Sequence, residues 1–172
     1  MSNYRRAYIT GGHYFFTVVT YQRIGLFADK DKVARLGEAF RHVKKRHPFS
    51  VDAIVVLPDH LHTIWRLPED DADFSVRWRL IKHYLARGLD CPTNRRGEKL
   101  LWQRRFWEHL LRDEEDWRNH VDYIHYNPVR HGYSNSPIEW KYSSFTSAVK
   151  RGWYEADWGC NEPAHIQKMQ LE

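Results

Sequence analysis

The chain has 172 residues, of which 42% are hydrophobic and 15% aromatic, and this composition predicts one folded domain rather than a disordered chain. Its formal net charge of +5 fits a phosphate-bearing partner, although many proteins of this charge bind no nucleic acid. Cys91 and Cys160 lie far apart without a CxxC spacing, which argues against a disulfide framework or a zinc finger and fits a reducing cytoplasm. The basic N-terminus lacks a secretory apolar region, and no stretch approaches the ~18 apolar residues of a membrane span, so we expect a cytoplasmic protein without membrane contact.

The first half of the chain predicts three strands and one helix. Residues 14–20 are rich in aromatic and β-branched side chains and indicate a strand. Residues 30–46 place apolar side chains at helical spacing, and Pro48 stops that helix. Two further strands, 50–57 and 60–67, are separated by so short a link that they form an antiparallel hairpin.

The second half predicts mainly helices. Ser75 can cap a helix over 75–89, and after a polar connector a strand is expected over 106–111. A helix over 113–127 should end before Pro128, and a short one should cover 143–151. The order β-α-β-β-α-β favours an α+β sandwich, ferredoxin-like or RRM-like, with a central antiparallel sheet, flanking helices and a C-terminal helix. We expect one domain over residues 1–158 and a tail over 159–172 that lacks periodicity and is free to move.

His60 and His62 are the most informative pair of residues. Side chains alternate between the faces of a strand, so these two imidazoles should project side by side while Leu61 points the other way. Imidazole is a common ligand for divalent metals, so the pair could hold one ion. A half-exposed strand can also carry two histidines for no chemical reason, and the pair alone is weak evidence.

A second cluster lies on the helix over 113–127. At about 100° per residue, Tyr123 and Asn127 lie roughly 40° apart on one face, while the apolar stripe through Val121 and Ile124 lies elsewhere. If that face meets the two histidines, two imidazoles and an amide oxygen could bind Mg²⁺ or Mn²⁺, without excluding Zn²⁺. The phenol could then attack phosphorus and form a covalent phosphotyrosine. Tyr126 is the rival nucleophile, but it is turned about 100° away from Asn127.

Several segments, in this order, resemble the REP-associated tyrosine transposases, a branch of the single-tyrosine HUH transposases of bacterial insertion sequences. The similarity extends from about residue 3 to Trp158. The matching segments are residues 4–6, 11–12, 15–18, 55–62, 74–78, 102–109 and 120–132.

The resemblance implies that His60 and His62 are the metal ligands, that Tyr123 is the nucleophile, and that Asn127 completes the metal site. It implies a DNA endonuclease and strand transferase that cleaves and rejoins single-stranded hairpin DNA of the REP type. The expected product is a 5′-phosphotyrosyl enzyme with a free 3′-OH. The resemblance also favours a monomer, with a homodimer left open, in the bacterial cytoplasm and associated with the nucleoid.

Cations close to aromatic residues suggest where DNA binds, because bases stack on rings while cations follow the backbone. Any of these side chains could equally be solvated or part of the core. The candidate DNA-binding residues are Arg5, Arg6, Arg77, Trp78, Lys82, Arg104 and Arg105.

Other polar residues near the two clusters have open roles. Three histidines crowd the Tyr123 region and are expected to be structural or to contact DNA rather than metal. Two aspartates could support the ligands or simply lie in turns and on the surface. These residues are His120, His125, His131, Asp59 and Asp122.

Two other functions remain as alternatives. A domesticated transposase could bind hairpins without cutting DNA. In that case a Tyr123→Phe variant would keep the whole effect of the protein in the cell. A metal hydrolase of small phosphoesters would form no covalent intermediate and would need no hairpin DNA.

Overall fold

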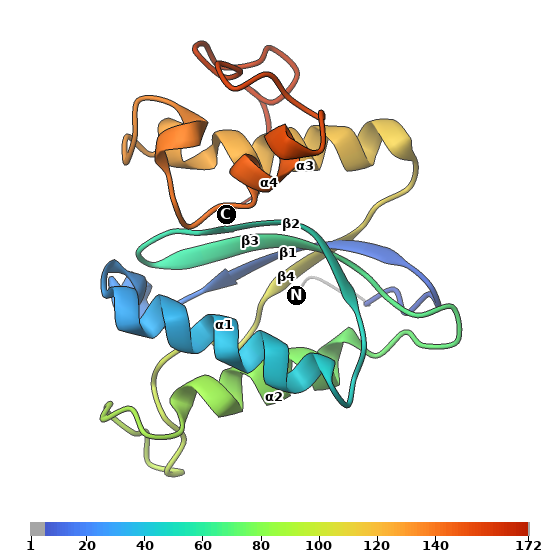
Figure 1. Ribbon diagram of the computed structural model, residues 1–172. Helices are drawn as coiled ribbons and strands as arrows, with labels where there is room; N and C mark the ends of the chain where they lie inside the picture. Colours follow the sequence, from blue (N-terminus) through green and yellow to red (C-terminus); the bar gives the residue numbers. More distant parts are fainter. Residues whose placement is uncertain (1–5, 172) are drawn as a thin grey trace.

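The computed structural model describes residues 6–171, and four strands and four α-helices lie within them (Figure 1). In chain order they are β1 (His13–Val19), α1 (Lys30–Lys44), β2 (Ser50–Val56), β3 (His60–Arg66), α2 (Phe74–Ala86), β4 (Trp107–Leu110), α3 (Glu114–Arg130) and α4 (Phe145–Lys150). Short 3-10 turns cover Tyr21–Arg23, Leu26–Ala28 and Pro137–Glu139.

The strands form one sheet in the order β2-β3-β1-β4, and every neighbouring pair is antiparallel. Together with the element order, this arrangement confirms the ferredoxin-like α+β sandwich. The hairpin between β2 and β3 is also confirmed. Because β3 lies inside the sheet, its residues are held on both sides by backbone pairing.

One face of the sheet is covered by α1 and α2, which lie below it in Figure 1. Phe16 and Trp65 point to this side, where the indole of Trp65 stacks on that of Trp78 from α2 with 4.3 Å between ring centroids. The N-terminus of α1 is capped by the Asp29 side chain, which accepts a hydrogen bond from the Asp31 backbone.

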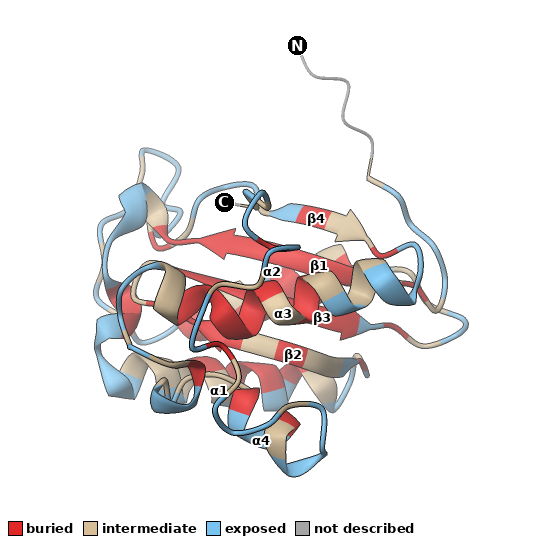
Figure 2. Ribbon diagram, turned by 90° about the horizontal axis from the view of Figure 1, so that it is seen from above, coloured by how far each residue is buried: buried red, intermediate tan, exposed pale blue. Residues whose placement is uncertain are grey.

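The opposite face is covered by α3, which crosses above β2 and β3 (Figures 1 and 2). Phe15 and Ile64 point to this side and pack with Val121 and Ile124 of α3. Side chains alternate along β3, so Leu61 belongs to the α1/α2 side, and its neighbours His60 and His62 face α3.

Several expected helix boundaries differ from the structure by one to three residues, and two of the differences have a clear physical reason. Helix α3 continues through Pro128 to Arg130 instead of ending at Asn127. Pro128 removes one N–H donor, and this costs little in the last turn, where the amide of His131, three residues later, still donates to the Asn127 carbonyl. Helix α2 begins at Phe74 and is capped by Asp73, which accepts from the Val76 backbone, rather than by Ser75.

The segment after Gly159 packs against the rest of the protein as far as Leu171. Ile166 is fully buried in the cluster that contains Tyr123 and Ile124. The division between residues 1–158 and 159–172 stays a prediction, but the described part of the tail is attached to α3. Within residues 6–171, no helix has the length and apolar character needed to cross a membrane.

Candidate active site

His60 and His62 lie side by side on β3, as the strand pattern predicts. Their ring centroids are 4.9 Å apart, and the ring planes are inclined by 79°. Both side chains are buried, and their backbones pair with Val19 and Thr17 of β1. The central position of β3 in the sheet therefore holds the two imidazoles in a constant relative geometry.

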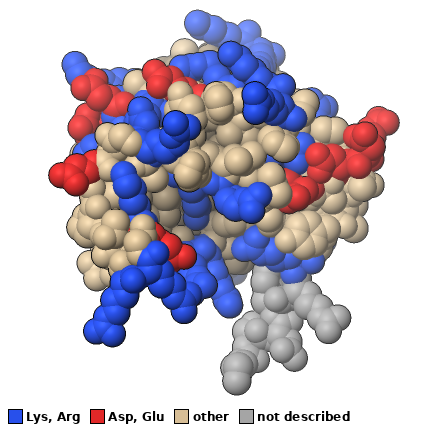
Figure 3. Space-filling view, turned by 90° about the horizontal axis from the view of Figure 1, so that it is seen from below, with Lys and Arg blue, Asp and Glu red and all other residues tan. Residues whose placement is uncertain are grey.

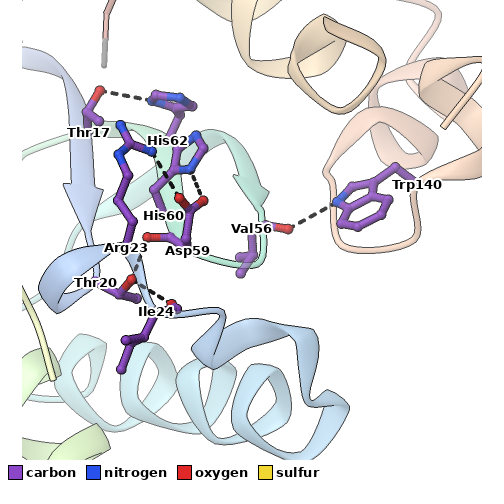
Figure 4. A network of polar contacts seen from close by, with 9 residues as sticks. All are labelled: Thr17, Thr20, Arg23, Ile24, Val56, Asp59, His60, His62 and Trp140. Atoms are coloured by element: carbon purple, nitrogen blue, oxygen red, sulfur yellow. Dashed lines mark hydrogen bonds and ion pairs between the residues drawn. The ribbon is translucent and has the colours of Figure 1, made fainter. Parts of the chain in front are cut away.

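Each imidazole is oriented by a neighbour at Nδ1 (Figure 4). The Asp59 carboxylate lies 2.6 Å from Nδ1 of His60, and the Thr17 hydroxyl lies 2.9 Å from Nδ1 of His62. Burial raises the pKa of Asp59, but hydrogen bonds from His60 and Arg23 outweigh that effect and lower the pKa overall. An ionised Asp59 keeps the proton of His60 on Nδ1, so the lone pair of that ring is on Nε2.

Tyr123, Asn127 and His131 follow one another at intervals of four residues along one face of α3 and its C-cap. The Tyr123 ring lies 5.3 Å from the ring of His62, and the His131 ring lies 5.3 Å from that of His60. Asn127, fully buried, lies between Tyr123 and His131 along the helix, about one turn from each. The three residues therefore line up along the histidine pair.

The surroundings of Tyr123 distinguish it from Tyr126. The ring of Tyr123 lies 6.1 Å from Phe15, and the guanidinium carbon of Arg130 lies 5.4 Å from its centre. The ring of Tyr126 instead packs against Trp158 on another side of α3. The structure thus brings Tyr123, and not Tyr126, to the histidines.

The donors at this site fit a divalent metal ion. Two imidazoles held through Nδ1 present Nε2, and the neighbouring amide offers an oxygen. This combination of two nitrogens and one oxygen is typical of metal sites that leave positions open for a substrate.

The other histidines of this region have different surroundings. His125 is fully buried, contacts the Ser144 hydroxyl at 2.9 Å, and has a pKa lowered to about 3 by burial. His120 contacts the Asp116 carboxylate at 3.1 Å, and His109 contacts it at 2.9 Å. These three side chains are close enough together to hold a metal. However, the two rings stack within 18° of parallel, so hydrogen bonds to Asp116 account for the group without an ion.

Two expected DNA contacts are corrected by burial. The Arg77 side chain is 1% exposed, and its guanidinium donates to the carbonyls of Asp73 and Pro48 and to the Asp71 carboxylate. Trp78 is fully buried against Trp65. Both side chains stabilise the α1/α2 side of the core, so neither is available to DNA.

The remaining basic candidates differ in how far they are exposed. Arg6 contacts Glu108 at 3.4 Å and lies over the Phe106 ring, whereas Arg104 and Arg105 are exposed. Lys82 lies near Trp102 and Phe106, and burial lowers its pKa to about 8. Lys and Arg side chains spread over the α1/α2 face (Figure 3). Arg5 lies outside the described residues.

The C-terminal segment reaches the histidine pair. The Thr17 hydroxyl, which contacts His62, also lies 2.5 Å from the Leu171 carbonyl oxygen. The Arg130 guanidinium donates to the Ile166 carbonyl at 3.3 Å. This segment therefore covers part of the site.

Sequence reasoning did not assign roles to Thr17 or Arg23, and it left the role of Asp59 open. Asp59 could have been recognised because it directly precedes a candidate ligand in a turn. Thr17 and Arg23 carry no such signal, because they reach the site only through the pairing of β1 with β3.

Known proteins similar to this chain are transposases. The family model described as "Transposase IS200 like" matches residues 8–127. A putative REP-associated tyrosine transposase of Haemophilus influenzae is 42% identical over 174 residues, covering 97% of this chain and 98% of the relative. A REP-associated tyrosine transposase of Escherichia coli is 46% identical over 159 residues, covering 92% and 91%.

A solved structure of a REP-associated tyrosine transposase bound to a REP hairpin is similar over 99% of both chains. It superposes with a TM-score of 0.81 at 42% sequence identity. Fold and sequence thus agree over nearly the whole length, and the chain belongs to the IS200-like transposases, among the REP-associated tyrosine transposases.

Proposed function

We propose that this transposase is a metal-dependent endonuclease and strand transferase that cleaves and rejoins single-stranded DNA at the foot of a REP-type hairpin. Tyr123 is the nucleophile, and the intermediate is a 5′-phosphotyrosine. His60, His62 and Asn127 are the proposed ligands for Mg²⁺ or Mn²⁺.

The observation that carries the proposal is the contact between Tyr123 and the histidine pair. The Tyr123 ring lies 5.3 Å from that of His62, on the α3 face that it shares with Asn127. A phenol of ordinary pKa, about 10, is a weak nucleophile at neutral pH, so a nearby cation is needed to favour its ionised form. When bound, a divalent ion supplies this positive charge and stabilises the charge of the phosphate in the transition state.

The residues of the chain have distinct tasks in cleavage. Asp59 and Thr17 hold the two imidazoles in orientation, and α3 presents the phenol oxygen of Tyr123 to the phosphorus. The bond from Tyr123 oxygen to phosphorus forms while the bond from phosphorus to the 3′-oxygen breaks. The phenol proton passes to solvent water, and the leaving 3′-oxygen takes a proton from solvent to become a 3′-OH. Rejoining reverses these changes, with a 3′-OH as the attacking group.

Two features support a hairpin substrate. The REP-associated transposase of known structure was solved with a REP hairpin. The α1/α2 face of this chain carries many cations, which suit a phosphate backbone (Figure 3). Arg104 and Arg105, in the connector between α2 and β4, are also exposed. Binding to chromosomal hairpins would also associate the protein with the nucleoid.

We propose that one chain is sufficient for activity. Tyr123 and both histidines meet within a single chain, so a partner subunit is not needed to complete the site. Light scattering of the active protein at assay concentrations should therefore give a mass near 20.8 kDa. A mass twice as large would contradict this part of the proposal.

The proposal is tested with a labelled REP hairpin that carries a single-stranded extension, incubated with Mg²⁺ or Mn²⁺ and run on a denaturing protein gel. A labelled protein band that requires metal should form with the wild type and with Tyr126→Phe, and should be absent with Tyr123→Phe. Tyr126→Phe is the matched control because it removes a phenol from the same helix on another side. Hairpin binding without any such band would instead favour a non-catalytic DNA-binding protein.

A further inference from the structure

The turn after β1 holds a backbone conformation that is costly for its residues. Gln22 and Arg23 have φ values of 50° and 53°, in the left-handed region that L-residues with a Cβ disfavour. Among the described residues other than glycine, these two have positive φ. Such strain persists where the surroundings enforce it, and it often accompanies a functional site.

The surroundings that enforce this turn start from Thr20, which is fully buried. Its hydroxyl lies 2.7 Å from the Ile24 carbonyl and 2.8 Å from the Asp59 carbonyl, and its backbone N–H donates to the same Asp59 carbonyl (Figure 4). The turn is thus attached to the residue that precedes His60, and its position relative to the histidines is determined.

The Arg23 side chain extends this attachment to the site itself. Nη1 of Arg23 lies 3.0 Å from Oδ2 of Asp59, while Oδ1 of the same carboxylate lies 2.6 Å from Nδ1 of His60. One carboxylate therefore joins a guanidinium to a candidate metal ligand. The Arg23 side chain is 44% exposed, whereas that of His60 is 1% exposed. The guanidinium therefore lies on the solvent side of Asp59, and His60 lies on its buried side.

A purely stabilising role does not explain this arrangement. Ion pairs with a half-exposed partner contribute little to stability, and this one requires an unfavourable backbone. A guanidinium has five N–H donors in a planar fork, so contact with one carboxylate is compatible with a second contact to a phosphate. Arg23 is also restrained before substrate binds, which lowers the entropic cost of such a contact.

We propose that Arg23 is a catalytic residue that binds a nonbridging oxygen of the scissile phosphate. This inference rests on the proposed strand cleavage at Tyr123 and adds a protein cation to it. Arg23 transfers no proton in this step. Its charge offsets the negative charge that the phosphate gains in the transition state. Asp59 holds the guanidinium in place during both cleavage and rejoining.

The first experiment measures single-turnover formation of the DNA–protein adduct with Arg23→Gln and Arg23→Lys. Loss of a donor to a developing oxyanion lowers rates by about 100-fold or more, so we expect such a loss for Arg23→Gln and a smaller one for Arg23→Lys. Affinity for a hairpin without the cleavage site should change less than about threefold, since phosphate contacts elsewhere are intact. Arg66→Gln, at the opposite end of β3, is the control and should cleave like the wild type.

A second experiment asks whether Arg23 acts on the scissile phosphate. A methylphosphonate at that position removes one phosphate charge, and its effect is measured in the wild type and in Arg23→Gln. If Arg23 contacts this phosphate, the two changes share one interaction, and the combined loss is smaller than the product of the separate losses. Losses that multiply would overturn the proposal.

A metal-binding measurement separates phosphate binding from support of His60. Mn²⁺ affinity without DNA, measured by electron paramagnetic resonance, should be similar in Arg23→Gln and the wild type. A loss of Mn²⁺ affinity that accounts for the whole rate effect would overturn the proposal. So would adduct formation by Arg23→Gln at the wild-type rate. Absence of an adduct from the wild type would instead contradict the proposed cleavage by Tyr123.

Discussion

Replacement of Asp59 tests whether His60 is a metal ligand. The Asp59 carboxylate is 18% exposed, lies 2.6 Å from Nδ1 of His60, and has a lowered pKa, so it is ionised at neutral pH. Loss of a carboxylate that orients a ligating histidine typically lowers metal affinity about 10- to 100-fold. This corresponds to about 1.4 to 2.8 kcal/mol of binding free energy. We expect a loss of this size in Asp59→Ala.

Asp59→Asn separates orientation from charge. The amide oxygen can still accept from Nδ1 of His60, so this variant should bind metal more tightly than Asp59→Ala but less tightly than the wild type. Titration calorimetry with Mn²⁺ measures the metal affinity of both Asp59 variants, and His60→Ala gives the affinity of a site without that ligand. Asp122→Asn is the matched control, because Asp122 pairs with His165 away from the site. Wild-type affinity in a folded Asp59→Ala would refute the reasoning.

Three further predictions concern pH and the C-terminal segment. Burial holds the pKa of His125 at about 3, below its ordinary 6.5, so the unfolded chain binds a proton that the folded chain does not. The free energy of unfolding should therefore fall as the pH drops below about 6.5, by up to about 1.4 kcal/mol per pH unit from this residue. When it is measured by urea unfolding at several pH values, its dependence on pH should be weaker in His125→Gln. An equal pH dependence of stability in the wild type and in His125→Gln would contradict this. Lys82, with a pKa of about 8, should lose its charge as the pH rises through that value. Hairpin affinity in a shift assay should then decrease in the wild type but not in Lys82→Arg, and equal decreases would exclude a role for its charge. A chain ending at Gln167 lacks the Leu171 carbonyl that contacts Thr17. This shortened chain should form the adduct several-fold faster, because the part of the site beside His62 is no longer covered. An unchanged rate would show that the segment does not limit the access of DNA to the site.

Local patterns in the sequence were sufficient for the fold and for the side-by-side histidines. Alternation along β3 and the short link before it place His60 and His62 on one face, and helical spacing places Tyr123 with Asn127. The ordered motifs also carried the resemblance to REP-associated tyrosine transposases, which the comparisons confirm. The roles of the individual site residues stay predictions that the experiments above test.

Local patterns were less reliable where the burial of a side chain decides its role. Arg77 and Trp78 looked like DNA contacts because a basic residue stands beside an aromatic one, but α2 turns both into the core. Pro128 looked like a helix end, yet at this point of α3 the loss of one donor is tolerated.

The sequence by itself determined the element order, the class of fold and which chemical groups each element carries, because these depend on the spacing of residues close together in the chain. Only the tertiary structure decided that α3 lies across β2 and β3, bringing Tyr123 to His62 and His131 to His60. It also decided that β1 pairs with β3, which brings Thr17 to His62 and Arg23 to Asp59. The physical reason is that these contacts join residues 36 to more than 60 positions apart. No local periodicity encodes such distances; they follow from how the sheet and helices pack to bury both apolar faces.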